Sequence, residues 1–212
     1  MQKDICILAN SRKKGGFCVA GKDVTTNEWV RIVGDSNGTE LSLTQIAYSD
    51  TMGQVHRTPY EPFNKFLRID LGQCVPLNYQ PENILVTPTR WQQVHISEPN
   101  INLDTPPDLW GNGDRIKALD IKQGRIIISQ SLYWIKVNNL QFYVNDFNTN
   151  RAYFQYGGID YDLGATMNPV IFQSLLNGTM LHNDIITVSL AGAFFNNYSG
   201  QCEHYKLVAA VF

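Results

Sequence analysis

The feature that most constrains this chain is a series of short apolar runs separated by Gly, Asn, Asp or Pro along most of its length. β-Branched and aromatic side chains fit a pleated sheet, and the residues between the runs favour turns. The pattern therefore predicts many short strands and little helix. In the first half the predicted strands are Ile5–Ala9, Phe17–Ala20, Trp29–Val33, Phe66–Leu71, Ile84–Thr87 and Val94–Ile96.

The second half repeats this character. Asn138-Asn139 and Gly157-Gly158 lie between apolar runs and tolerate positive φ, so each predicts a hairpin turn. Two short helices are predicted, one at Asp114–Lys122 and one at Val170–Leu176 after Asn168-Pro169. The predicted strands are Arg125–Ser129, Leu132–Val137, Leu140–Val144, Ala152–Tyr156, Ile159–Leu163, Ile185–Leu190 and Lys206–Val211.

A stretch rich in Pro and Gly, Ser97–Gly113, separates the two β-rich halves and is typical of a linker or a long surface loop. We therefore predict an N-terminal domain at 1–98, a linker at 99–113 and a C-terminal domain at 114–212. Five or six short strands with one short helix in each half fit the OB-fold, a partly open five-stranded barrel. The predicted fold class is all-β with minor helix, as two tandem OB-like small β-barrels. A pair of sandwiches is the alternative, because periodicity does not separate the two.

The charge balance limits the classes of ligand. The 212 residues carry 17% charged side chains and a formal net charge of −2, which excludes a strongly basic protein that wraps nucleic acid. A local basic groove on a nearly neutral body stays compatible with these totals. The hydrophobic content of 43% is enough for real cores, so a disordered chain is excluded as well.

The cysteines and the apolar runs indicate the compartment. Cys6, Cys18, Cys74 and Cys202 form no C-x-x-C pair, so we expect buried reduced thiols and neither a zinc site nor another cofactor. The apolar run at the N-terminus is too short for a signal peptide, and none approaches the ~20 residues of a spanning helix. These features predict a cytoplasmic protein without a membrane partner.

A basic turn is the first candidate ligand site. Three consecutive cations and two glycines lie between the first two predicted strands. Guanidinium and ammonium groups bind phosphate, and glycines let the backbone approach a ligand closely. The alternative is a solvated hairpin tip that is basic without function. The candidate ligand-binding residues here are Ser11, Arg12, Lys13, Lys14, Gly15 and Gly16.

Trp29 and Arg31 form a second candidate, because strand alternation would place both on one face. An aromatic ring can stack on a base while a guanidinium two residues away holds a phosphate. The alternative places Trp29 in the core and pairs Arg31 with a carboxylate such as Asp35.

A third candidate comprises Arg151, Tyr153 and Tyr156, on or beside one predicted strand. Aromatic side chains next to an arginine on a barrel face suit stacking of a single strand, although ordinary strand composition supplies the same aromatics. Asp160 and Asp162 would face one way on the next strand, where a divalent metal or a solvated turn are the alternatives.

Several of these segments also occur together in one known family. The four segments, in chain order, are Leu8–Gly21 followed by Trp29–Arg31, then Tyr79–Asn83, then Arg151–Thr166, then Ser189-Leu190 with Tyr205–Ala210. They resemble the motifs N-S-x-K-x-G-G-x-C-x-A-G…W-x-R, Q-P-E-N and R-F-x-Y-x-G-x-x-Y-D-L-x-V-T-D-P, and the C-terminal strand, of bacterial dual OB domain-containing proteins.

This resemblance implies two OB-like barrels in a module that binds nucleic acid or a nucleotide, often suspected in bacterial antiphage or conflict loci. It implies no established catalytic mechanism. One departure is Thr166-Met-Asn-Pro169 where the family pattern has T-D-P. Any ligand or metal role of that Asp is therefore lost or passes to Asn168.

The leading functional prediction is a non-enzymatic module that binds single-stranded nucleic acid or a small nucleotide or other phosphorylated ligand. The first alternative is a metal-dependent enzyme that processes nucleic acid or nucleotides through Lys13, Arg31, Asp160 or Asp162. The second is a protein–protein adaptor whose basic turn meets an acidic partner encoded in the same locus. The sequence does not predict the oligomeric state.

The basic turn generates a direct test. We expect the double substitution Arg12→Ala and Lys13→Ala to leave the fold intact and to abolish ligand affinity, because it removes the charges that attract an anion. Circular dichroism reports on the fold, and titration with labelled oligonucleotides and nucleotides reports on affinity. Normal binding by the double variant would refute the assignment of the site.

Overall fold

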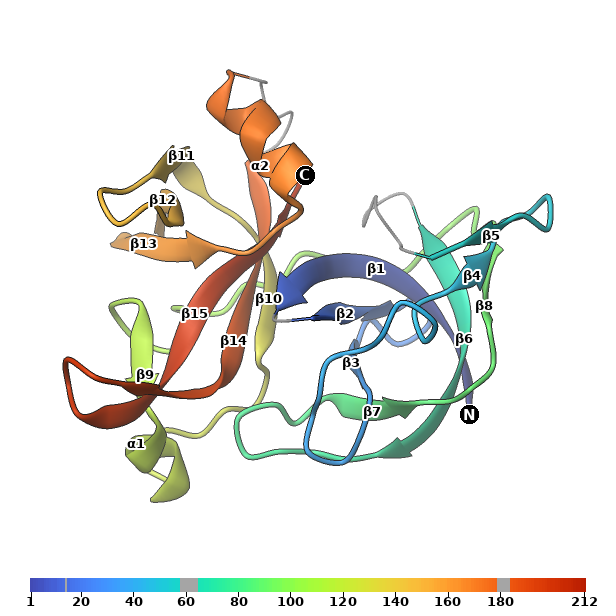
Figure 1. Cartoon of the computed structure of the whole chain (residues 1–212), viewed down its shortest axis with the longest axis horizontal. Helices are drawn as coiled ribbons and strands as arrows, with labels where there is room; N and C mark the ends of the chain where they lie inside the picture. The colour runs from blue at the N-terminus through green and yellow to red at the C-terminus, as the bar shows by residue number, and fades with distance from the viewer. Residues whose placement is uncertain (14, 58–64, 179–183) are drawn as a thin grey trace. The chain divides into compact units, whose positions relative to one another are not determined.

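The computed structural model describes residues 1–13, 15–57, 65–178 and 184–212, with the side chain of Lys13 left out. Contacts divide the chain into two compact units (Figure 1). The first unit comprises Met1–Leu77 and Glu82–Asn102, and the second comprises Asn78–Pro81 and Leu103–Phe212. Each unit has its own hydrophobic core.

The first unit is a β-barrel closed by its own first strand. Its strands are β1 (Gln2–Lys13), β2 (Gly16–Asp23), β3 (Trp29–Val33), β4 (Tyr48–Ser49), β5 (Val55–His56), β6 (Phe66–Cys74), β7 (Asn83–Val86) and β8 (Trp91–Val94). Hydrogen bonding runs β1-β2-β3-β7-β6, and β6 pairs again with β1. β3 and β7 are parallel, and the other pairs of this ring are antiparallel.

The closing strand β1 is bent, because its register with β2 shifts between Ile7 and Ala9. A bulge of this kind bends a strand and lets it pair with a different neighbour at each end. Side chains from the inner faces of the strands fill the barrel, among them Ile5, Val30, Leu67 and Trp91.

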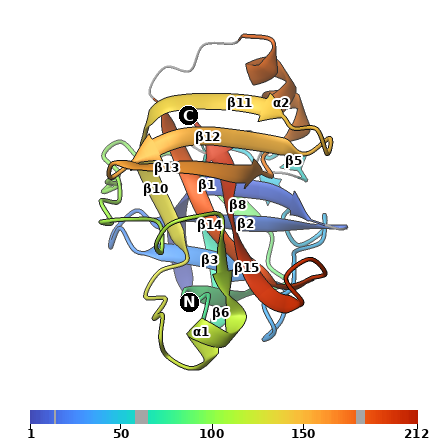
Figure 2. The ribbon, with the colours of Figure 1, turned by 90° about the vertical axis from the view of Figure 1, so that its left-hand side faces the viewer.

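The second unit contains a barrel with the same order of pairing. Its elements are β9 (Arg115–Lys117), α1 (Ala118–Lys122), β10 (Leu132–Lys136), β11 (Asn138–Val144), β12 (Asn150–Tyr156), β13 (Ile159–Ala165), α2 (Pro169–Leu176), β14 (Ile185–Asn196) and β15 (Gln201–Val211). Hydrogen bonding runs β10-β14-β15-β13-β12-β11, with β13 parallel to β15 (Figure 2). Because β10 and β11 are nearly continuous, they serve as one bent strand that closes a five-stranded ring. The predicted all-β class with two OB-like barrels is confirmed.

One predicted hairpin is confirmed and another is wrong. Gly157 and Gly158 have φ of 58° and 78° and join β12 to β13 with Tyr156 opposite Ile159. By contrast, β10 pairs with β14 and β11 pairs with β12, so no hairpin turns at Asn138-Asn139. Asn139 does adopt a positive φ of 55°, but the bend lies within the closing strand.

The region before β10 also differs from its prediction. Residues 115–117 form strand β9 on β15 rather than the start of a helix, and only Ala118–Lys122 is helical. No strand forms at Arg125–Ser129, because the backbone N–H groups of Arg125 and Ile126 turn back to the carbonyl oxygen of Asp120.

Helix α2 confirms the prediction for Val170–Leu176 and gives Asn168 a local structural role. Asn168 is the N-cap residue, and its side-chain oxygen accepts a hydrogen bond of 2.9 Å from the backbone N–H of Val170. Pro169 occupies the first turn, where its missing N–H is tolerated. Asn and Asp cap helices about equally well, so an Asp at position 168 would also suit the N-cap of α2.

The segment that precedes β9 packs against the second unit. Leu109 is fully buried in its core, and the indole Nε1 of Trp110 donates to the carbonyl of Gln130 at 2.8 Å. The Oη of Tyr156 donates to the carbonyl of Pro106 at 2.7 Å. Whether 99–113 links two independently folding domains, 1–98 and 114–212, stays a prediction. Among the described residues, no helix is long and apolar enough to span a membrane.

Gly21 provides a test of the first barrel. A Cβ atom at this position would lie 2.0 Å from the carbonyl oxygen of Cys6, so Gly21→Ala forces β1 and β2 apart. We expect a loss of about 3 kcal/mol or more in the free energy of unfolding, measured by denaturant titration. Gly192→Ala is the matched control, because its nearest contact would be an ordinary 3.8 Å to Tyr79. Equal stability of the two variants would contradict this packing.

Candidate nucleic-acid interface

The basic turn is the hairpin that joins β1 to β2. Arg12 lies opposite Phe17, and its Cζ lies 5.4 Å from the centre of the Phe17 ring. Gly15 has a φ of 89°, which favours glycine, whereas a Cβ on Gly16 would lie 2.5 Å from that of Glu40. The hairpin therefore requires both glycines for structural reasons, with Ser11 next to Arg12 on β1. Lys14 and the side chain of Lys13 lie outside the described part of the chain.

Trp29 and Arg31 are placed differently from a ligand-binding pair. Every residue of β3 is buried, including both of these. The guanidinium of Arg31 lies 3.5 Å from the carboxylate of Glu82, and both side chains are 8% exposed. The alternative in which Arg31 pairs with a carboxylate is therefore correct, with Glu82 instead of Asp35 as the partner. This ion pair joins the W-x-R segment to the Q-P-E-N segment, which are far apart in the sequence.

In the second unit, Arg151 lies on β12 beside Asp162 of β13. The guanidinium Nε lies 3.1 Å from the carboxylate of Asp162, and Nη2 donates to the backbone carbonyl of the same residue at 2.5 Å. The Oη of Tyr143 donates to the other carboxylate oxygen at 2.7 Å. Burial opposes the charge of Arg151, but the hydrogen bond and the charge of Asp162, together with Tyr143 and Asp114, outweigh burial and raise the pKa of the guanidinium.

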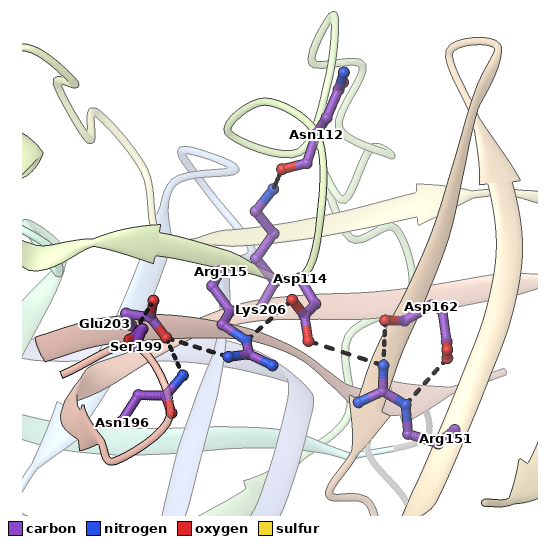
Figure 3. Close-up of polar contacts among 9 residues, drawn as sticks. All are labelled: Asn112, Asp114, Arg115, Arg151, Asp162, Asn196, Ser199, Glu203 and Lys206. Atoms are coloured by element: carbon purple, nitrogen blue, oxygen red, sulfur yellow. Dashed lines mark hydrogen bonds and ion pairs between the residues drawn. The ribbon is translucent and has the colours of Figure 1, made fainter. Parts of the chain in front are cut away.

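These ion pairs extend into a chain across one side of the second unit (Figure 3). Asp114 lies 3.2 Å from the Nε of Arg115 and 3.9 Å from Nη2 of Arg151. Arg115 also contacts Glu203 of β15 at 3.3 Å. The carboxylates of Asp114, Asp162 and Glu203 thus hold both guanidinium groups in fixed places, which favours planar stacking by Arg115 and Arg151 over capture of loose phosphates.

The predicted tyrosines of β12 have different surroundings. Tyr153 is partly exposed, and a hydrogen bond with Asp160 raises the pKa of its hydroxyl. Tyr156 is tied to Pro106 by the bond described above, and burial raises the pKa of its hydroxyl. The structure therefore places Arg151 and Tyr153 on one face of the sheet. Tyr156 instead anchors the segment before β9 through its bond to Pro106.

Sequence reasoning missed the most exposed aromatic side chains of this unit. Tyr198 is fully exposed, Phe194 and Phe195 are each 55% exposed, and Phe147 is 84% exposed. Tyr198 lies in the turn between β14 and β15, a hairpin that extends past β9 in Figure 1. Three aromatic residues in the run Phe-Phe-Asn-Asn-Tyr beside a turn were the available signal.

Contacts between planar side chains connect this hairpin to Arg115 through Tyr205. The rings of Phe194 and Tyr205 meet edge to face with centroids 5.5 Å apart. The Cζ of Arg115 lies 5.1 Å from the centre of the Tyr205 ring. The exposed ring of Phe194 and the guanidinium of Arg115 offer flat groups on which a flat ring, such as a nucleobase, can stack.

Two of the exposed aromatic residues, Phe147 and Tyr198, lie in loops that OB-folds use to hold ligands. In barrel order, β12 and β13 are the second and third strands, Phe147 lies in the loop between the first two, and Tyr198 lies in the loop between the last two. OB-folds bind oligonucleotides and oligosaccharides on the face of strands 2 and 3 and through these two loops. The basic turn of the first unit likewise joins the first two strands of its barrel.

The structure brings no metal ligands together among the described residues, where no group of three His, Cys, Asp or Glu side chains is suitably placed. Asp162 is engaged by Arg151 and Tyr143, as described above. The Nδ1 of His204 lies 2.9 Å from the carbonyl of Ala191, and burial lowers the pKa of its ring.

All four cysteines are free. Burial raises the pKa of the Cys6 thiol to about 12, so that thiol is unreactive. Cys74 and Cys202 are exposed, which corrects the expectation that all four thiols are buried.

A buried lysine, Lys206, holds the segment before β9 through two hydrogen bonds to its backbone. Lys206 is fully buried, and its Nζ donates to the carbonyls of Gly111 and Asn112 at 2.6 and 3.2 Å. The same Nζ lies 5.6 Å from the centre of the Tyr161 ring. Burial lowers the pKa of Lys206 to about 8. Its contacts are those of a structural anchor.

Comparison with known proteins agrees with this architecture. A family profile described as "Dual OB-containing domain" matches residues 3–211, so the chain belongs to the dual OB-containing domain family. No curated protein and no solved structure shows significant similarity to the chain.

Lys206 predicts a specific dependence of stability on pH. Between pH 8 and 10.5, Lys206 keeps its proton in the unfolded chain and loses it in the folded one. Rising pH in this range therefore increases the free energy of unfolding, by up to about 3 kcal/mol in total. We expect Lys206→Met to destabilise the protein, and its deficit relative to the wild type to widen from pH 7.5 to pH 10. Urea titrations of both proteins at each pH measure this difference in the free energy of unfolding. A difference that stays constant with pH would contradict the burial of the Lys206 charge.

Proposed function

We propose that the second barrel binds short single-stranded nucleic acid by stacking bases on its exposed aromatic side chains. The observation that carries this proposal is the position of the exposed side chains of Phe147 and Tyr198 on the two loops that border the face of strands β12 and β13, with the exposed Phe194 near the end of β14. Membership of the dual OB-containing domain family supports it, because OB-folds commonly bind nucleic acids.

Energetics favour stacking as the main source of affinity. A base stacked on an aromatic side chain contributes about 1–3 kcal/mol, and the contribution is tolerant of sequence. Large aromatic side chains that stay exposed gather on surfaces that bind a partner. Because Asp114, Asp162 and Glu203 offset the charges of Arg115 and Arg151, phosphate attraction on this face is weak. Binding there should therefore depend on salt less steeply than binding by a basic groove.

The basic turn of the first unit is proposed as a separate contact with phosphate. Arg12 lies near the end of β1, opposite Phe17, in the hairpin whose Gly15 adopts a positive φ. Backbone N–H groups and cations in such a turn suit a phosphate of a strand or of a free nucleotide. A steep salt dependence that disappears in the Arg12→Ala and Lys13→Ala double variant would assign the phosphate contact to this turn.

The two alternatives from the sequence have distinct signatures. An enzyme would turn over oligonucleotides or nucleotides with magnesium, and Asp162→Ala would abolish turnover while Lys13→Ala would not. The pairing of Asp162 with Arg151 and Tyr143 favours a structural role for that carboxylate. An adaptor would bind an acidic protein of its own locus through the basic turn and would bind no oligonucleotide.

The setting in a bacterial antiphage or conflict system stays a prediction. The cytoplasmic location also stays a prediction, and the free, exposed thiols of Cys74 and Cys202 support it because such thiols persist in reducing compartments.

Substitution of Tyr198 tests the proposal. We expect Tyr198→Ala to weaken binding of a fluorescent single strand of about ten nucleotides by about tenfold or more, because one stacking contact is lost. Tyr198 is fully exposed, so the fold should not change. Met52→Ala is the control, because Met52 is likewise a large, exposed side chain, 81% exposed, but belongs to the first unit.

Fluorescence anisotropy at two salt concentrations gives both the affinity and its salt dependence. Wild-type affinity for duplex DNA equal to that for the single strand would contradict stacking, because duplex bases are already stacked on one another. Unchanged affinity in Tyr198→Ala would remove the hairpin from the site.

A further inference from the structure

The β14–β15 hairpin, which carries Phe194, Phe195 and Tyr198, is called the aromatic hairpin below. One buried carboxylate stabilises its turn. Glu203 is 7% exposed and lies on β15, opposite Phe194 of β14. Its Oε2 accepts a hydrogen bond of 2.6 Å from the side-chain amide of Asn196, and its Oε1 accepts one of 3.1 Å from the hydroxyl of Ser199 (Figure 3). Both partners belong to the end of the hairpin, so the two oxygens hold the turn from within.

Asn196 carries this restraint to Tyr198. The side-chain oxygen of Asn196 accepts a hydrogen bond of 3.0 Å from the backbone N–H of Tyr198. Its backbone carbonyl accepts another from the N–H of Gly200 at 2.8 Å. Asn196 is buried, and its amide group is fixed by Glu203. The carboxylate therefore determines the backbone position of the fully exposed Tyr198.

The same carboxylate also contacts Arg115, which packs on Tyr205. Oε2 lies 3.3 Å from Nη1 of Arg115, the guanidinium that lies over the ring of Tyr205. Tyr205 in turn meets the exposed ring of Phe194. In Figure 3, Glu203 therefore contacts Asn196 and Ser199 near the turn as well as Arg115.

We infer that Glu203 is the positioning residue of the stacking surface, since it preforms the hairpin turn and the Arg115–Tyr205 stack before a strand arrives. This inference rests on the proposed function. Each side chain that a ligand must immobilise lowers the affinity, so a preformed site binds more tightly than a loose one. A hydrogen bond from Asn196 lowers the pKa of Glu203, which keeps the carboxylate ionised and accepting at neutral pH.

The test is a double-mutant cycle between Glu203→Ala and Tyr198→Ala, measured as affinity for the same fluorescent single strand. Glu203→Ala should weaken binding by about threefold to tenfold, the range expected when one or two side chains lose their preorganisation. Tyr198→Ala should then have a smaller effect in the Glu203→Ala background than in the wild type, because the ring is no longer held. Fully additive effects would overturn the inference, since they would show that Glu203 acts independently of the turn.

Glu203→Gln is the conservative variant. Its amide oxygen can still accept from Asn196 and Arg115, and its amide N–H can donate to the hydroxyl of Ser199. Affinity within about twofold of the wild type is therefore expected. Gln201→Ala is the matched control, because Gln201 is exposed on the same hairpin, opposite Asn196.

A measurement without nucleic acid separates this inference from the proposed function. Chymotrypsin cleaves after aromatic residues in loose segments, so Glu203→Ala should be cut after Phe195 or Tyr198 faster than the wild type and faster than Gln201→Ala. If the wild type bound no oligonucleotide, the proposed function would fail while this comparison would still decide the role of Glu203. Equal cleavage rates of all three proteins would overturn that role.

Discussion

Both barrels depend on one strand that pairs with a different neighbour at each end. In the first unit, β1 pairs with β6 through its beginning and with β2 through most of its length, and the register shift near Leu8 gives the required bend. In the second unit, β10 and β11 divide the same task on either side of Val137. A small sheet closes only if a strand turns such a corner, and closure removes the exposed edges that favour aggregation.

Closure of the second barrel brings the candidate site together. The parallel contact of β13 with β15 brings Arg151 and Asp162 within reach of Asp114 and Arg115. The resulting chain of ion pairs fixes the guanidinium groups on the surface beside the aromatic hairpin (Figure 3). The candidate surface is therefore a consequence of the barrel, because β9, β12 and the β14–β15 hairpin are distant in the sequence.

Several motif residues that the sequence offers as ligand contacts have structural partners in the fold. Arg31 pairs with Glu82, and Arg151 pairs with Asp162. Asn168 caps α2. Motif recognition identified the family correctly, and yet a shared motif reflects the needs of folding as well as those of binding. The exposed aromatics at Phe147, Phe194 and Tyr198 lie outside the four quoted motif segments and carry the functional proposal.

The sequence by itself determined the features that depend on neighbouring residues. The Gly157-Gly158 turn, the cap at Asn168 and the β character of both halves follow from local sterics and hydrogen bonding, which act over a few residues. Tertiary structure alone decided that Asn139 bends a strand, that Glu82 pairs with Arg31, and that Glu203 lies beneath an aromatic turn. The physical reason is that these outcomes depend on partners brought together by barrel closure, and residue order along the chain carries no signal of that pairing.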